Sequence, residues 1–173
     1  MAGKFVQINQ AVASTTASLS VTGMTDTYDT YCLIGRSYYP DVADQLEIRV
    51  TKSGTAQSDS EYDFSYQSLY GSSQQIIEGA DNATHYVQYN SQEESGSDAL
   101  GNQIVIWCYN FRSTQPSICT VQSTWEQYQG TLFSSEGGFI HTVNSVSDGL
   151  NFTYGGSTNI TAGTFTLFAL QKD

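Results

Sequence analysis

The chain has 173 residues and charged side chains make up 13% of it, which is long enough to bury a core but well below the roughly 25% charge of ordinary globular proteins. The 17 acidic residues against 6 Lys and Arg give a net charge of -11, so the backbone of a nucleic acid would be repelled and DNA or RNA is not an expected partner. The longest apolar run is far shorter than the roughly 20 residues of a membrane span, so we expect neither membrane insertion nor a secretory leader.

Short runs with a two-residue period recur along the chain, whereas no segment keeps helical spacing for three turns. Together with 12 Tyr and 8 Phe, this pattern predicts an all-β fold. In chain order the predicted strands are residues 5–9, 17–22, 31–37, 45–52, 62–67, 84–89, 103–111, 118–126, 138–144, 149–154 and 164–171.

Two kinds of strand are predicted. Residues 45–52 alternate apolar and polar side chains, as in a strand with one face in water. Residues 103–111 are apolar on both faces, with Ile104, Ile106 and Cys108 on one face. A strand of this second kind has its other face covered either by neighbouring loops or by another subunit. The predicted interface residues are Val105, Trp107, Tyr109 and Phe111, with Phe5, Val6 and Ile8 from the N-terminal segment.

Turn-forming residues separate the predicted strands at 52–59, 71–75, 91–101, 134–138 and 155–159, and the most polar of these connections is 91–101. The strand count and the long connections favour an antiparallel β-sandwich of the jelly-roll type over an immunoglobulin sandwich. We expect residues 1–24 to form an N-terminal arm for docking and assembly, and residues 25–173 to form the sandwich domain.

Catalytic and cofactor chemistry finds little support in the sequence. Cys32, Cys108 and Cys119 are odd in number and lack a CxxC spacing, so we expect reduced core thiols in a protein made in a cytoplasm. His85 and His141 lie in predicted strands without a nucleophile motif, and we expect structural or exposed roles for both.

Acidic residues cluster at several turns, but no pair stands out as the acid and base of a glycosidase. The acidic run 59–63 supplies oxygen ligands that suit calcium, yet it lacks the spacing of a calcium loop, so no metal and no cofactor are predicted. The clusters considered are Asp41 with Asp44, Asp59 with Glu61 and Asp63, and Glu93 with Glu94.

Several segments resemble the jelly-roll domains of tail-fibre and capsid-surface proteins of marine tailed phages, including cyanophages. The similarity is carried by YDTYCLI at 28–34, YPDVAD at 39–44, QLEIRV at 45–50, QIVIWCYNF with RST at 103–114, and GLNFTYGGSTNITAGTFTLFAL at 149–170. The resemblance implies a non-enzymatic virion protein. No coiled-coil or repetitive shaft precedes the similar region, which fits a capsid decoration, a knob or a short tail appendage better than a long fibre.

We therefore expect a homo-oligomer, with a trimer as one form, displayed on the virion surface after synthesis in the host cytoplasm. Its expected partners are copies of itself, other capsid or tail proteins, and a glycan of the host surface. The alternatives are a carbohydrate-binding module or a receptor-binding fibre tip, in which exposed aromatic side chains hold a glycan. A depolymerase ranks last because no catalytic pair can be singled out.

Overall fold

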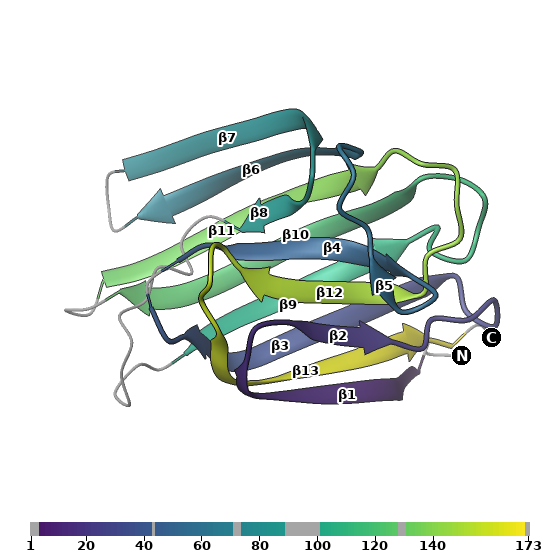
Figure 1. Cartoon of the computed structure of the whole chain (residues 1–173), viewed down its shortest axis with the longest axis horizontal. Coiled ribbons are helices and arrows are strands. Elements are labelled where there is room, and N and C mark those ends of the chain that lie inside the picture. The colour runs from purple at the N-terminus through teal and green to yellow at the C-terminus, as the bar shows by residue number, and fades with distance from the viewer. Residues whose placement is uncertain (1–3, 43, 71–73, 89–100, 128–130, 172–173) are drawn as a thin grey trace.

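A computed structural model shows two antiparallel β-sheets that pack face to face (Figure 1). The structure describes residues 4–42, 44–70, 74–88, 101–127 and 131–171, and these residues contain no helix. Within the described ranges, therefore, no helix is available to cross a membrane.

The described part of the chain forms thirteen strands. In chain order they are β1 (Phe5–Thr16), β2 (Leu19–Thr22), β3 (Thr30–Pro40), β4 (Leu46–Lys52), β5 (Thr55–Ala56), β6 (Tyr62–Tyr70), β7 (Gln74–Ala83), β8 (Tyr86–Gln88), β9 (Asn102–Tyr109), β10 (Ser117–Gln127), β11 (Thr131–His141), β12 (Gly149–Tyr154) and β13 (Ile160–Leu170).

The larger sheet has eight strands in the order β1-β13-β3-β9-β10-β11-β6-β7. The smaller sheet has the order β2-β12-β4-β5, and β8 also pairs with β4. The ends of the chain meet, because β1 pairs with β13 and β2 pairs with β12. Inside these pairs, β3 pairs with β9 and β4 pairs with β8. The pairs are nested and fall alternately in the large and the small sheet.

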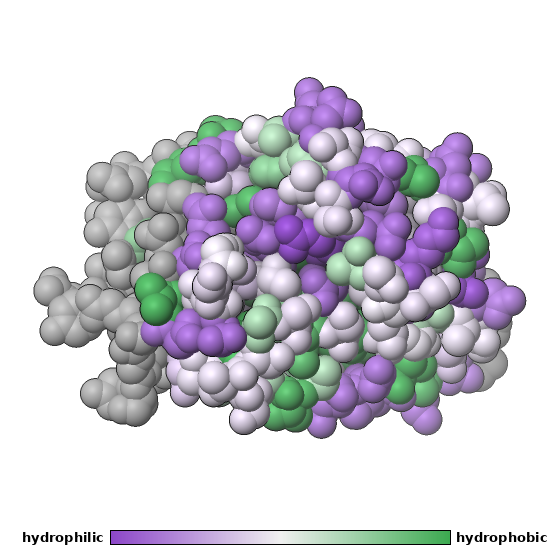
Figure 2. Space-filling view, viewed as in Figure 1, coloured by the Kyte–Doolittle hydropathy of each residue, from purple (hydrophilic) through white to green (hydrophobic). Residues whose placement is uncertain are grey.

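The core lies between the two sheets and follows the alternation of the strands. Leu46, Ile48 and Val50 of β4 are fully buried, and so are Leu33, Ile106 and Leu167 of the large sheet. Each fully buried side chain of this size contributes roughly 1.5–3 kcal/mol of transfer free energy. The opposite face of the small sheet, seen in Figure 2, is mainly hydrophilic with scattered apolar spots.

The all-β sandwich predicted from the sequence is confirmed. The apolar side chains of the alternating strand β4 are buried, and so are Ile104, Ile106 and Cys108 on one face of β9. One predicted connection is wrong, because residues 134–138 lie inside β11. Of the predicted connection 71–75, Gln74 and Gln75 belong to β7 and residues 71–73 lie outside the described residues. In the predicted connection 91–101, only Gly101 belongs to the described residues.

The N-terminal segment differs from the expected arm. Its described part forms β1 along the edge of the large sheet and β2 along the edge of the small sheet. Ala13 and Val21 are buried in the core. Residues 5–22 are therefore part of the sandwich, because their alternating side chains complete both sheets instead of leaving the domain.

Candidate functional site

The outer face of the large sheet, turned away from the small sheet, carries the features most suited to binding. Antiparallel register sets side chains of neighbouring strands opposite one another on the same face. One row runs from Val105 of β9 through Gln122 of β10 and Glu136 of β11 to Gln67 of β6. Pairing therefore brings together polar side chains that are far apart in the sequence.

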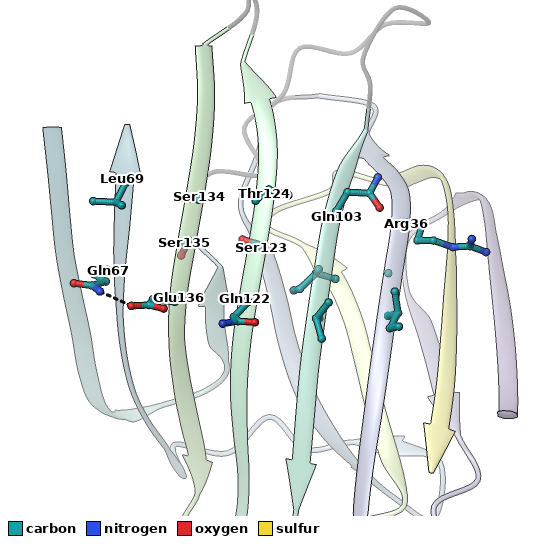
Figure 3. A pocket seen from close by; sticks show the side chains of 14 residues that line it. Arg36, Gln67, Leu69, Gln103, Gln122, Ser123, Thr124, Ser134, Ser135 and Glu136 are labelled. Carbon is teal, nitrogen blue, oxygen red and sulfur yellow. Dashed lines mark hydrogen bonds between the residues drawn. The ribbon is translucent and has the colours of Figure 1, made fainter. Parts of the chain in front are cut away.

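A hollow of about 510 Å³ lies over β3, β9, β10, β11 and β6 on this face (Figure 3). Amide, hydroxyl and carboxylate side chains line it together with aliphatic side chains, which contribute much of its surface. We call it the polar groove after its amides and its carboxylate, and its main outer-face side chains are Ile34, Gln67, Leu69, Gln103, Val105, Gln122, Thr124, Ser134 and Glu136.

A second hollow of about 550 Å³ adjoins the polar groove. The two share Gln67, Gln122 and Glu136, and the second is bordered by Trp107 and Ile77. The residues in register with Trp107 on the neighbouring strands have small side chains or none. They are Thr120, Gly138, Ser65 and Gly79. An indole ring thus stands beside a strip with little side-chain volume.

The polar side chains of the groove are partly held in place. Gln67 Nε2 donates a hydrogen bond of 2.6 Å to Glu136 Oε1, across the β6–β11 pair. Figure 3 shows this contact and Gln122 in the same row, while Arg36 extends over β13, away from Glu136. The centre of the groove therefore holds a single carboxylate among amides and hydroxyls.

An apolar patch adjoins the second hollow at Trp107, and its residues belong to β10, β9, β13 and β1. The ring centroid of Phe5 lies 5.9 Å from Trp107 and 6.2 Å from Phe168. Phe5 is 49% exposed, Ile118 39% and Tyr109 36%. We call this surface the apolar patch; it consists of Phe5, Trp107, Tyr109, Ile118, Phe168 and Leu170.

Cys32 lies on the outer face under this patch, in register between Phe168 and Trp107. It is only 3% exposed. Burial, assisted by the nearby Cys108, raises the pKa of the Cys32 thiol to about 11, so the thiol stays protonated at neutral pH. Cys108 and Cys119 are likewise buried, with their sulfur atoms 3.8 Å apart. These two thiols lie in the core as expected, whereas Cys32 lies outside the core cluster.

The structure brings together four of the seven predicted interface residues. Val105, Trp107, Tyr109 and Phe5 share the outer face. Phe111 does not join them: it is 1% exposed and belongs to the core. The preceding Asn110 has a φ of 63°, which breaks the alternation of the strand and turns Phe111 inward.

Val6 and Ile8 also lie away from the patch. Val6 is opposite the buried Ala169, on the side of β1 that faces the core, and Ile8 packs against the core cluster. The sequence analysis in turn missed Gln67, Gln122 and Glu136. Polar residues at every second position of β10 were the available signal for one of them.

The two histidines lie apart from the groove. His85 Nδ1 is 3.2 Å from Arg49 and its Nε2 is 3.7 Å from Glu47, on β4 of the small sheet. Burial lowers the pKa of His85, and this effect outweighs the opposite effect of the negative charge of Glu47, which raises the pKa. These three side chains and Thr153 form a polar network, since Arg49 also bonds to Glu47 and Thr153.

His141 is 1% exposed, and its Nε2 lies 3.3 Å from Glu61 Oε2. Burial lowers the pKa of His141 more than Glu61 raises it. Of the acidic run 59–63, Asp63 accepts a hydrogen bond from the Asn82 N–H. Among the described residues no group of three His, Cys, Asp or Glu side chains is placed to hold a metal ion.

Comparisons of the chain with protein-family models, with curated proteins and with solved structures gave no match. The site is therefore defined by its own geometry: a broad sheet face with an apolar patch at one side and a polar groove at the other.

Proposed function

We propose that this chain is a non-enzymatic structural protein of a tailed-phage virion, displayed on the particle surface as a capsid decoration, a knob or a short tail appendage, and acting as a homo-oligomer. The observation that supports assembly is the apolar patch. Large apolar side chains that gather on one exposed face mark interaction surfaces in soluble proteins. The phage setting rests on the resemblance described above.

Charge favours a second copy of the chain as the partner of this patch. Two rows of the outer face contain no charged residue from β1 to β10. The first row begins with Phe5 and Leu170, and the second consists of Gln7, Phe168, Cys32, Trp107 and Thr120. The molecule as a whole carries a charge of -11. Two copies repel each other over most of their surfaces, so contact costs least where both surfaces are uncharged and apolar.

We also propose that the sandwich is of the jelly-roll type. A chain folded as a long hairpin and rolled up pairs its first strand with its last, and the next inward pairs fall alternately in the two sheets. The nested pairs β1–β13, β2–β12, β3–β9 and β4–β8 support this reading. The strands β10, β11, β6 and β7 then extend the larger sheet beyond this frame.

Sedimentation of the purified chain over a concentration series tests the assembly. We expect an oligomer for the natural chain and a monomer for Phe5→Gln combined with Ile118→Gln, because both substitutions place amides in the apolar patch. Val12→Gln is the matched control, since Val12 is 64% exposed on β1 but outside the patch, and we expect it to remain oligomeric. A natural chain that stays monomeric at all concentrations would refute the proposal.

Labelling the protein on intact particles tests the location. Antibody to the chain should decorate the outside of the virion in electron micrographs. Labelling of disrupted particles alone would place the protein inside and contradict a surface role.

A further inference from the structure

We infer that the polar groove binds an extended, uncharged glycan, with Gln67, Gln122 and Glu136 as hydrogen-bonding residues and Trp107 as an apolar wall for a sugar ring. This activity is additional to the proposed assembly and uses an adjoining part of the same sheet face, with Trp107 at the border between the two. The argument rests on the shape of the hollows, their side chains, their charge and the pairing of the strands beneath them.

Shape indicates a ligand longer than one small ring. Hollows of about 510 and 550 Å³ lie side by side and share three residues, and each is within the roughly 300–1,000 Å³ of ordinary ligand sites. The second hollow lies beside the small side chains of Ser65 and Thr120, which leave it open next to Trp107.

The side chains at the centre of the groove suit hydroxyl groups. Each amide offers both donors and acceptors, and an ionised carboxylate accepts only. A sugar hydroxyl can donate and accept at once, so it can bond to Gln122 and Glu136 in the same row. The hydrogen bond between Gln67 and Glu136 orders two of the three side chains before the ligand arrives, which reduces the entropy lost on binding.

An aromatic ring beside these polar groups provides the second half of such a site. Trp107 borders the hollow that contains Gln67, Gln122 and Glu136. The apolar C–H face of a pyranose packs against an indole ring, while the hydroxyls at its edge reach polar neighbours. Contact of Trp107 with Phe5 on its other side, at 5.9 Å between centroids, supports the ring from the apolar patch.

Charge selects against polyanions. The centre of the groove contains Glu136, and the nearest cationic residue in its lining, Arg36, extends away over β13 (Figure 3). In a molecule of net charge -11, a sulfated or sialylated chain would meet repulsion without a compensating cluster of Lys or Arg. The ligand is therefore uncharged along most of its length.

Strand pairing selects against a peptide. Extended peptides bind sheets by adding a strand at an open edge, where backbone groups are free. Beneath the groove, β9, β10 and β11 each pair with a neighbour on both sides, so their backbone groups already bond within the sheet. Only side chains can recognise a ligand here, which favours a molecule that brings many hydroxyls of its own.

Titration of the full chain with neutral hexasaccharides of glucose, mannose and galactose, followed by calorimetry and by tryptophan fluorescence, tests this inference. We expect at least one to bind and to change the fluorescence of Trp107 in a Trp125→Phe background. Gln122→Ala and Glu136→Gln should each weaken binding roughly tenfold through the loss of hydrogen bonds. Gln10→Ala is the control, because Gln10 is an exposed glutamine of the same sheet face outside the groove.

Three results would overturn the inference: no binding of any neutral hexasaccharide, equal binding by Gln122→Ala and the natural chain, or tighter binding of a heparin hexasaccharide than of the neutral ones. Sedimentation of the same samples separates this inference from the assembly proposal. Gln122→Ala should keep the natural oligomeric state, and Ile118→Gln, which leaves Phe5 beside Trp107, should keep the affinity for the hexasaccharide.

Discussion

At the scale of single residues, Tyr62 joins the two sheets by its hydroxyl. The group accepts the N–H of Val50 in β4 at 3.0 Å and donates to the carbonyl of Gln57 at 2.9 Å. Tyr62 itself belongs to β6 of the large sheet and is fully buried. Burial raises the pKa of its hydroxyl well above the usual range for tyrosine, so the group is a neutral donor and acceptor at every working pH.

Replacing Tyr62 with Phe should lower the free energy of unfolding by about 1–3 kcal/mol. The buried N–H of Val50 would lose its acceptor, and an unsatisfied buried donor costs about that much. Urea unfolding measures the change. Tyr109→Phe is the control, because Tyr109 is partly exposed on the outer face and should change stability by less than about 0.5 kcal/mol. Equal effects of the two substitutions would contradict the role given to Tyr62.

The sequence predicted on which face of the sheet a residue near the candidate site lies only where the strand alternation held. Trp107 and Tyr109 follow the period of two and lie on the expected face, but the left-handed backbone at Asn110 sends Phe111 into the core. No local pattern could reveal the hydrogen bond between Gln67 and Glu136. These residues meet only because β6 pairs with β11.

At the scale of elements, β11 shows why a glycine pair need not mark a turn. Gly137 and Gly138 lie in the middle of this strand, where both neighbouring strands approach closely. An added Cβ at Gly137 would come within 2.4 Å of Ser65 O and 2.7 Å of the Tyr66 Cα. The sequence reads as a loop, yet close backbone packing requires the missing side chains.

Gly137→Ala should destabilise the protein by about 1–3 kcal/mol or more, because backbone atoms must shift to admit the methyl group. Gly54→Ala separates this steric cost from backbone strain. Gly54 has a φ of 77°, but an added methyl group there would meet no other atom within 4 Å, so its substitution should cost only about 1–2 kcal/mol of left-handed strain. Urea unfolding of both variants compares the two effects, and a smaller loss for Gly137→Ala would refute close packing at β11.

The N-terminal strands show that local sequence can predict a strand without predicting its pairing partner. The alternation of residues 5–9 correctly predicted a strand, but nothing local showed that β1 would find its partner in β13, more than 140 residues later. Pairing at that separation depends on the whole fold. The sequence therefore predicted the strand and misplaced it in an arm.

At the scale of the whole molecule, two histidines make stability depend on pH. Burial is the largest influence on both His141 and His85, and it lowers the pKa of each in the folded state. Unfolding returns both side chains to water, where the pKa is about 6.5. At pH values between the folded-state pKa and about 6.5, the unfolded state therefore binds more protons than the folded state.

The direction of the effect follows from this difference in proton binding. Where the unfolded state binds more protons, the free energy of unfolding rises with pH. Stability due to the neutral histidines is complete above about pH 7 and declines as the pH falls through about 6.5 toward the folded pKa. The acidic residues contribute little in this window, since their ordinary pKa values lie near 4.

Urea unfolding at several pH values between 8 and 5 should show this loss, and the double variant His85→Gln with His141→Gln should show a much flatter dependence. The comparison uses slopes, because removing His141 from beside the Tyr62 ring, at 4.9 Å between centroids, changes stability at every pH. His141→Gln alone should remove part of the slope and His85→Gln the remainder. A natural chain that gains stability on acidification from pH 7 to 5.5 would show that Glu61 and Glu47 outweigh burial, which reverses the assignment for both histidines.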